Sequence, residues 1–436
     1  MKVAFINTYD VYGGAAIACN RVFQAVRQAP AITSAKLLVQ QKDSQDANVL
    51  AWSTSFLGRK KAFLRFALER FYFLQFAKDR SVQYAFSPAN LGIDISKHPL
   101  IQEADIIHLH WTTFGFLSLK SLDKLAQLGK PVVWTLHDMW AFTGGCHYTG
   151  ECTNFHVSCG NCQFLKRPRS KDISYKIFQK KFKIFHQLDL HVVTSSHWLG
   201  QEAQQSSLFK RSINSSNQVS IQTIPTPIDI EAFKPVAKAE IRSKLKLNPQ
   251  KFQVLFGAMN IADQRKGFKY FEEALQILKS QYPDLNEQME LLIFGKASPE
   301  LLAALPYPVN NLGVLSGSEQ MSQAYNAADL FIIPSLEDNL PNTIIEALAC
   351  GTPTVAFHTG GIPDMIYHQH NGYLAQYKDA KDLAKGIHWA LAEADYVQLS
   401  QNAHQKALDN FTESAVAHQY IQLYQKVLAQ KNKPNK

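Results

Sequence analysis

The chain has 436 residues, enough for two or three domains that each bury a core, so a single small module is excluded. Hydrophobic residues make up 46% and charged residues 19%, which excludes an intrinsically disordered chain. The net charge of +9 favours partners that carry phosphate: nucleotides, nucleic acid or an anionic membrane surface. We expect a cytoplasmic protein without a transmembrane helix, because the apolar runs are strand-sized and the first residues lack a signal-peptide pattern.

The first half of the chain alternates short apolar runs with helix-length segments. Residues 3–7 predict a buried strand, and a loop with Gly13 and Gly14 leads from it into a helix over 15–27. Further strands are predicted at 106–110, 132–136 and 191–194. This alternation indicates an α/β domain whose parallel sheet is covered by helices on both faces.

A predicted helix over residues 56–80 concentrates positive charge and aromatic side chains. Seven basic residues stand against two acids between Arg59 and Arg80, a net charge of 7 − 2 = +5. The apolar residues form a broad face beside a narrow polar stripe. Two interpretations stay open: a helix that lies on an anionic membrane surface, or one that packs on its own domain and shows a charged edge to water.

Four of the six cysteines lie within seventeen residues, at positions 146–162. The C-x2-C spacing at the end of this cluster lets two thiolates bind one tetrahedral ion, and a structural zinc site is the prediction. Free thiols and a disulfide are the alternatives, and His147 and His156 are substitute ligands. The predicted ligands are Cys146, Cys152, Cys159 and Cys162.

The composition changes in the middle of the chain, and the strand–helix pattern then restarts. Residues 204–220 are rich in Ser, Asn and Gln, and a stiff connector follows at 224–228. We therefore predict two Rossmann-like domains facing each other across a cleft that holds the ligand site. The predicted segments are an N-terminal domain over 1–222, a C-terminal domain over 223–410, and over 411–436 a helix that packs back toward the first domain, followed by a basic tail.

The most informative motif runs from Pro334 to Val355. A strand ends at its start, a loop with Asp338 follows, and a helix begins near Asn342 and carries Glu346. Backbone N–H groups at a helix N-terminus attract an anion, and two carboxylates accept hydrogen bonds from hydroxyls, which suits a phosphate linked to a sugar. The alternative is that Asp338 or Asn342 caps the helix and Glu346 only favours its first turn.

Several common motifs are absent from the sequence. There is no G-x-G-x-x-G, no G-x4-G-K-[ST], no H-E-x-x-H and no G-x-S-x-G, which argues against ordinary dehydrogenases, P-loop enzymes, zincins and serine hydrolases. A D-x-D pair, which holds a divalent metal on a nucleotide sugar, is also missing. If the ligand is a nucleotide sugar, cationic side chains and helix ends must then bind its diphosphate in place of a metal.

With these motifs the chain resembles retaining glycosyltransferases of family 4, which have the two-domain GT-B fold. Residues 134–146 and 338–341 are similar to bacterial enzymes of exopolysaccharide synthesis, of the colanic acid type. The segments that carry the resemblance are Gly13–Gly14, Thr135–Asp138, Ser195–Trp198, Pro227–Asp229, Arg265–Gly267, Pro334–Val355 and Gly360–Asp364.

The resemblance implies transfer of a sugar from a nucleoside diphosphate to a hydroxyl, with retained configuration and without a catalytic cofactor or divalent metal. Lys266 matches the lysine that binds the donor diphosphate, Asp338 a residue that contacts the transferred sugar, and Glu346 the glutamate that holds the ribose. His137 matches a histidine near the reacting sugar. The further donor-binding positions that the resemblance implies are Gly13, Gly14, Arg265, Asn339 and Leu340.

The chain also departs from the family pattern. Asp338 replaces a glutamate, and Asn339–Pro341 replaces a Gly-Phe-Gly loop, so that Pro341 offers no N–H to a ligand. Ala258 stands where the family has an arginine, and Arg265 is the candidate to supply that charge. His108 and His110 share one face of a strand, and we expect them to be structural.

These observations predict a glycosyltransferase of bacterial surface-polysaccharide synthesis. We expect a nucleotide sugar as donor, a lipid-linked or growing saccharide as acceptor, and contact with the inner face of an anionic membrane. Two alternatives remain: a degenerate GT-B protein that binds nucleotide sugars without turnover, and a basic nucleic-acid-binding protein. Nucleic acid is not expected as a partner, because no recognisable RNA- or DNA-binding motif is present.

Overall fold

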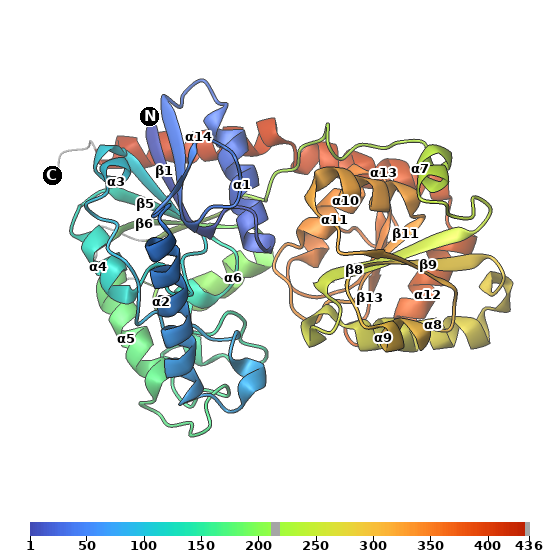
Figure 1. Ribbon diagram of the computed structural model, residues 1–436, viewed down its shortest axis with the longest axis horizontal. Helices are drawn as coiled ribbons and strands as arrows, with labels where there is room; N and C mark the ends of the chain where they lie inside the picture. Colours follow the sequence, from blue (N-terminus) through green and yellow to red (C-terminus); the bar gives the residue numbers. More distant parts are fainter. Residues whose placement is uncertain (211–218, 432–436) are drawn as a thin grey trace. The chain divides into compact units, whose positions relative to one another are not determined.

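The structure, a computed structural model, describes residues 1–210 and 219–431 (Figure 1). Two compact units are present. The N-terminal unit comprises Met1–Thr226 and Val416–Lys436, and the C-terminal unit comprises Pro227–Ala415. The end of the predicted basic tail, residues 432–436, and residues 211–218 of the predicted boundary region lie outside the described residues.

Within the described residues, the N-terminal unit is built on a seven-stranded parallel sheet in the order β3-β2-β1-β4-β5-β6-β7. Its central strands are largely apolar and buried along their whole length, as expected for strands covered on both faces. The strands are β1 (Lys2–Tyr9), β2 (Ser34–Gln41), β3 (Val49–Ala51), β4 (Ile106–Leu109), β5 (Pro131–Leu136), β6 (Asp189–Thr194) and β7 (Ser220–Thr223).

Alternate residues of these strands feed two separate cores. Val3 and Phe5 of β1 pack on one face, with residues of α1 and of α14, while Ala4 and Ile6 pack on the other face, with α4 and α5. The last helix, α14, therefore lies on the first sheet. The helices of this unit are α1 (Gly14–Arg27), α2 (Phe56–Leu74), α3 (Pro99–Glu103), α4 (Leu119–Ala126), α5 (Ile173–Phe185), α6 (His197–Gln205) and α14 (Glu413–Lys431).

The predicted helix over 56–80 ends earlier, at Leu74. Beyond it the backbone pairs with another segment: Lys78 N donates to Phe164 O at 2.8 Å, and Lys166 N donates to Phe76 O at 2.9 Å. These bonds replace the helical ones, because an amide that donates to a distant carbonyl cannot also extend the helix. Only a short 3₁₀ turn, Arg80–Val82, follows.

The C-terminal unit repeats the plan with a six-stranded sheet in the order β10-β9-β8-β11-β12-β13, whose pairs are parallel. The strands are β8 (Phe252–Asn260), β9 (Met289–Lys296), β10 (Val309–Gly313), β11 (Leu330–Ile333), β12 (Thr354–Phe357) and β13 (Gly372–Ala375).

Two cores again sandwich this second sheet. One face packs against α10 and α11, and the other against α8 and α12. The helices are α7 (Lys238–Lys244), α8 (Phe268–Gln281), α9 (Pro299–Ala303), α10 (Gly317–Ala327), α11 (Asn342–Ala349), α12 (Ala380–His388) and α13 (Tyr396–Asn410), with the 3₁₀ turn η4 (Gln264–Lys266) before α8. Across the described part of the chain, no helix is long and apolar enough to cross a membrane.

Candidate functional site

Three loops meet at the carboxyl ends of the strands in the C-terminal unit. They follow β8, β11 and β12, which are neighbours in the sheet. Leu336 N donates to Arg265 O at 2.7 Å, and Gly361 N donates to Asp338 O at 3.2 Å. The sequence segments 265–267, 334–341 and 358–361 are thus joined into one surface, at the edge where open α/β sheets bind ligands.

Two glycines allow this close approach. Gly267 has a φ of +69°, and a Cβ there would stand 1.8 Å from Pro334 O. Gly360 has a φ of +54°, and a Cβ there would stand 1.9 Å from Asp338 O. Any larger residue would push the loops apart, so both glycines are required by space as well as by backbone conformation.

Lys266 and Asp338 form an ion pair across these loops. Lys266 Nζ lies 2.7 Å from Asp338 Oδ2, and the two side chains are 29% and 14% exposed. Asp338 does not cap α11, whose N-cap is Pro341 and which has no side-chain cap. The capping alternative for Asp338 is therefore wrong, and its carboxylate faces the lysine with which the family resemblance groups it.

Glu346 lies on α11 and is buried. Its Oε2 accepts a hydrogen bond from the Tyr325 hydroxyl at 2.9 Å, which orients the carboxylate. Asn339 and Leu340, in the loop before α11, are also buried. Since Pro341 has no N–H, the first donors of this helix lie one residue further along the chain.

Arg265 is less firmly placed in this site than Lys266. Its guanidinium is about half exposed and bonds Asp263, with Nη2 at 2.8 Å from Oδ2. Ala258, which replaces the arginine of the family, is buried. The neighbouring Gly257 is packed against Phe294, whose ring would lie 2.3 Å from an added Cβ.

In the N-terminal unit, the predicted residues also stand at the carboxyl ends of strands. Gly13 and Gly14 follow β1, and His137 follows β5. Gly13 has a φ of +89° and is the N-cap of α1, but a Cβ there would meet nothing within 4 Å. Glycine is therefore favoured at position 13 by the positive φ of its backbone and not by lack of space, because the space around its Cα is open.

His137 belongs to an array of three histidines. His137 Nε2 lies 2.9 Å from His110 Nδ1, and the His110 ring in turn contacts that of His108, with centroids 4.4 Å apart. His108 is structural, as expected, since it bonds Thr135 Oγ1 at 2.8 Å and the Tyr424 hydroxyl at 2.7 Å. His110 is different, because it contacts the predicted catalytic histidine directly.

Burial keeps these histidines neutral. Desolvation lowers the pKa of His137 to about 4, against a smaller opposing effect of Asp138. Desolvation also holds the pKa of His108 and of His110 well below the usual range. At neutral pH the array therefore offers hydrogen bonds without net charge.

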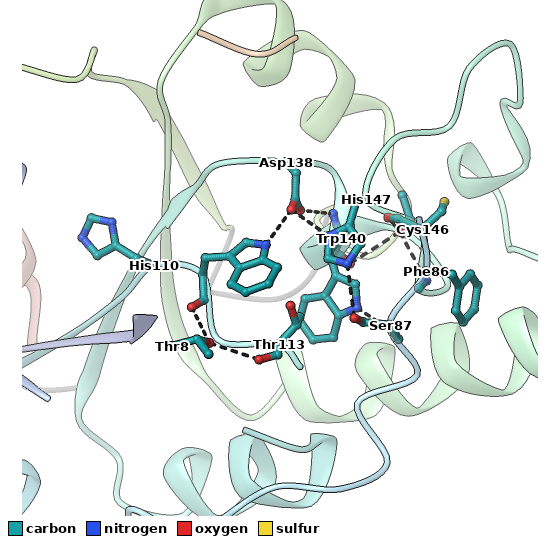
Figure 2. Close-up of polar contacts among 12 residues, drawn as sticks. Thr8, Phe86, Ser87, His110, Thr113, Asp138, Trp140, Cys146 and His147 are labelled. Atoms are coloured by element: carbon teal, nitrogen blue, oxygen red, sulfur yellow. Dashed lines mark hydrogen bonds and ion pairs between the residues drawn. The ribbon is translucent and has the colours of Figure 1, made fainter. Parts of the chain in front are cut away.

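Asp138, next in sequence, joins a second polar network (Figure 2). Its Oδ2 lies 2.8 Å from Trp111 Nε1 and 2.7 Å from His147 Nδ1, and its Oδ1 accepts from Trp140 N at 2.8 Å. Burial tends to raise the pKa of Asp138, but His147 and these hydrogen bonds lower it below its usual value. Asp138 is thus an ionised, fully partnered carboxylate.

The same network has the atom order of a hydrolase triad. His147 Nε2 lies 3.2 Å from Ser87 Oγ, so that Asp138, His147 and Ser87 follow one another as acid, base and hydroxyl. Ser87, however, is completely buried, and its Oγ also lies 3.3 Å from Arg70 Nη2. No substrate reaches this hydroxyl, and the network is structural.

Arg70 extends the network to α2. It pairs with Glu69 at 2.6 Å, and Glu69 Oε2 accepts from Gly115 N at 2.9 Å. Both side chains are buried, and burial raises the pKa of Glu69 against the opposing effect of Arg70. Sequence reasoning missed this pair; the adjacent opposite charges in an aromatic-rich helix are the signal that was present.

The four cysteines predicted as zinc ligands come together in the structure. They form no disulfide and line one small cavity beside Phe86. Burial raises the pKa of Cys159 to about 12 and of Cys162 to about 11. Among residues 1–210 and 219–431, no group of three or more His, Cys, Asp or Glu is placed to hold a metal ion. The zinc site therefore stays a prediction.

Comparison with known proteins finds a family match within the C-terminal unit. Residues 251–393 match the family model "Glycosyl transferases group 1". The chain is 22% identical over 342 residues to the putative colanic acid biosynthesis glycosyl transferase WcaC of Escherichia coli K12, covering 75% of this chain and 76% of the relative.

Two further similarities are informative. N,N'-diacetylbacillosaminyl-diphospho-undecaprenol alpha-1,3-N-acetylgalactosaminyltransferase of Campylobacter jejuni is 30% identical over 168 residues, which is 37% of this chain and 42% of that relative. The structure of Anabaena Alr3699/HepE in complex with UDP-glucose matches with a TM-score of 0.62 and 16% identity over 98% of this chain and all of that one. With the two parallel sheets, this match confirms the predicted GT-B fold.

Proposed function

We propose that the chain transfers a sugar from a nucleoside diphosphate sugar to a hydroxyl of a lipid-linked or growing saccharide in bacterial surface-polysaccharide synthesis. The match of residues 251–393 to the glycosyl transferases group 1 family supports this function. One observation carries the proposal. A lysine and an aspartate, Lys266 and Asp338, meet at 2.7 Å on glycine-dependent loops at the carboxyl edge of a parallel sheet.

The ion pair supplies both halves of a donor site. When the diphosphate arrives, Lys266 exchanges its carboxylate partner for phosphate oxygens, in a charge-assisted contact of the same kind. Asp338 is then released to accept hydrogen bonds from hydroxyls of the transferred sugar. Because the pair is partly exposed, opening it costs far less than opening a fully buried pair.

Glu346 serves the nucleoside. Its buried carboxylate, oriented by the Tyr325 hydroxyl, is an acceptor for vicinal hydroxyls, which are what a ribose presents. Glu346 follows Asp338 on the same loop and helix, so the contacts to the transferred sugar and to the ribose come from one continuous segment.

His137 and the glycine loop serve the reacting sugars. A neutral imidazole, oriented by His110, hydrogen-bonds a sugar hydroxyl without adding a positive charge beside the developing oxocarbenium ion. At Gly13, the open space above the backbone lets a ligand approach the main chain closely.

In the proposed reaction, the acceptor hydroxyl attacks the anomeric carbon of the donor sugar on the same face from which the diphosphate departs. The acceptor oxygen forms a bond to the anomeric carbon as the bond from that carbon to the diphosphate breaks. A donor phosphate oxygen takes the acceptor proton, and Lys266 stabilises the charge that accumulates on the diphosphate. The configuration is retained, and the lysine performs the task that a divalent metal performs in other transferases.

The relatives support the substrate class. WcaC is named for colanic acid biosynthesis, the Campylobacter relative for transfer to a diphospho-undecaprenol saccharide, and HepE is a complex with UDP-glucose. Each name points to a nucleotide sugar or to a bacterial glycan.

The test is ligand-induced thermal stabilisation with uridine, guanosine, adenosine and thymidine diphosphates and their sugars, with and without EDTA. A ligand at a hundred times its dissociation constant adds about 2.7 kcal/mol to the free energy of unfolding, which is readily seen. We expect one base to stabilise the protein in EDTA, and its sugar nucleotide to be hydrolysed slowly without acceptor.

Other outcomes would overturn the proposal. Stabilisation by no nucleotide sugar, together with salt-sensitive RNA binding, would favour a nucleic-acid-binding protein. Tight donor binding without hydrolysis or transfer to any saccharide acceptor would indicate a non-catalytic GT-B protein. Loss of binding in EDTA would contradict the metal-independent mechanism.

A further inference from the structure

Helix α2 presents an apolar face to solvent. The exposed fractions of Phe56, Phe63 and Phe71 are 69%, 69% and 64%. These three rings are seven and eight residues apart along the helix, which is two turns each time, so they share one side. We call this the α2 apolar face, and it consists of Phe56, Leu57, Phe63, Leu64, Leu68 and Phe71. Soluble monomers rarely expose so many large apolar side chains together, so the face requires a partner.

The opposite side of α2 is fixed to the N-terminal unit. Glu69 accepts from Gly115 N at 2.9 Å, and Arg65 Nε donates to Gly115 O at 3.0 Å. Gly115 has a φ of +80°, and a Cβ there would lie 2.8 Å from Phe66 N. The helix is therefore seated closely on its own unit, and the exposed apolar side is not a consequence of loose packing.

Composition left two interpretations open for this helix: it lies on a membrane surface, or it packs on its own domain. The structure combines features of both. Three of the charged residues of α2, Arg59, Lys60 and Lys61, are exposed. The other three lie on the seated side: Glu69 and Arg70 are buried and pair with each other, and Arg65 bonds Gly115 O. No exposed acid lies on α2. The helix packs on its own domain with its polar buried pair and turns its apolar side outward.

The exposed charges beside the α2 apolar face indicate which kind of partner covers it. Near the first turns of α2, the apolar side chains stand beside cationic ones, and Lys60 Nζ lies 4.4 Å from the centre of the Phe56 ring. Further exposed basic residues, Lys78 and Arg80, follow the helix. Apolar side chains insert into the acyl boundary of a bilayer, and lysine and arginine beside them bind anionic headgroups.

We propose that α2 docks the N-terminal unit on the surface of an anionic phospholipid bilayer, with the α2 apolar face inserted and Arg59, Lys60 and Lys61 at the headgroups. A second copy of the chain fits less well. In a two-fold contact, the same basic residues of both copies would meet without exposed acids of the helix to pair with them. The proposal stands apart from the sugar-transfer chemistry, because no residue of the donor site lies on α2.

The experiment is flotation of the full chain with vesicles of phosphatidylcholine alone and of equal parts phosphatidylcholine and phosphatidylglycerol. We expect binding to the anionic vesicles that weakens as salt is raised. K60E/K61E should lose at least about twentyfold in binding, since one basic residue near an anionic surface contributes about fivefold. F63S/F71S should lose at least about tenfold, because two inserted rings are removed.

Two variants are matched controls. K381E/K385E makes the same charge change with two exposed lysines of α12 in the C-terminal unit, and V314S/V397S removes two exposed apolar side chains of that unit. Both should bind the vesicles as the unaltered chain does. All variants change exposed side chains, so their melting temperatures should stay within a few degrees of the original.

The proposal fails if the anionic vesicles do not bind the chain, or if K60E/K61E and K381E/K385E weaken binding equally, which would indicate diffuse charge. It also fails if sedimentation shows a dimer that F63S/F71S converts to a monomer, since the face would then join two copies. Transfer to a soluble acceptor should be unchanged in every α2 variant, which separates this result from the donor-site proposal.

Discussion

The carboxyl edges of the two sheets are built in opposite ways. In the C-terminal unit the edge holds a partly exposed ion pair, Lys266 with Asp338, on loops held together by glycines. In the N-terminal unit the edge holds neutral buried histidines, and its ionised Asp138 is fully partnered within the protein. The same architecture therefore supports one charged surface and one neutral surface.

The difference fits the proposed function. In that proposal the lysine exchanges partners to bind the negatively charged diphosphate, whereas the neutral His137 faces the reacting sugar. The charges of the N-terminal edge hold the loops, and the charges of the C-terminal edge remain available. Changes to the first set should affect folding, and changes to the second set should affect activity.

The largest effect expected is on activity. Lys266→Ala should lower kcat/KM about a thousandfold, or about 4 kcal/mol, because the leaving diphosphate loses its cation. Its melting temperature should stay nearly unchanged, since the pair is partly exposed. Lys269→Ala on α8, which removes an exposed lysine paired with Glu273, is the control. Near-normal transfer by Lys266→Ala would remove this residue from the mechanism.

A substitution in the buried ion pair of the N-terminal unit should instead lower the stability of the fold. Glu69→Ala leaves Arg70 buried without its carboxylate and should lower the free energy of unfolding by about 3 kcal/mol, measured by urea denaturation. The control is Glu103→Ala, which breaks the exposed pair with Lys2 and should cost less than about 1 kcal/mol. Equal losses in the two variants would contradict the structural role of the buried pair.

Asp338→Asn should separate binding from transfer. We expect transfer to fall about thirtyfold, since a charge-assisted contact to the sugar is weakened, whereas the affinity for the nucleoside diphosphate should stay equal or rise, because Lys266 is released. Calorimetry with the diphosphate and steady-state kinetics give the two values. A parallel loss of both would argue against contact with the transferred sugar.

The histidine array makes stability depend on pH. Because the pKa of His137 is lowered to about 4 in the folded state, the unfolded state binds a proton first as pH falls below about 6.5. His137 by itself contributes a decline in stability of about 1.4 kcal/mol per pH unit from about pH 6.5 toward pH 4. His137→Asn should reduce the slope by this amount, while His108 and His110, whose pKa values are also lowered, maintain the rest. His186→Asn, at an exposed position, should leave the slope unchanged. An unchanged slope in His137→Asn would refute the assignment.

The smallest effect is expected at Arg265. Its guanidinium is half exposed and paired with Asp263, so Arg265→Ala should weaken diphosphate affinity only about threefold. Titration of the variant with the diphosphate measures this. A loss as large as that of Lys266→Ala would show that Arg265 replaces the arginine absent at Ala258.

The sequence predicts features that depend on neighbouring residues better than contacts between residues far apart in the chain. Largely apolar runs such as those of β4, β5 and β11 predict buried parallel strands, because strands covered on both faces carry few polar residues. Strands β2, β3, β7, β10 and β13 were not predicted. All of them except β2 are edge strands, whose short or polar segments lack that pattern, and β2 has a polar residue at each end. The motif from Pro334 to Val355 carries local signals of a loop and a helix start, whereas Lys266 was identified only through the family resemblance.

Only the tertiary structure decided which distant groups meet. The pairing of Lys266 with Asp338, the contact of His110 with His137, and the burial of Glu69 with Arg70 join segments or environments that spacing does not encode. The gathering of the four cysteines around one cavity is likewise a tertiary feature, because cysteine spacing states only that the thiols are near in sequence. The sequence by itself determines the local periodicity of helices and strands, whereas side-chain contacts, and the end of α2 at Leu74, depend on how the elements pack.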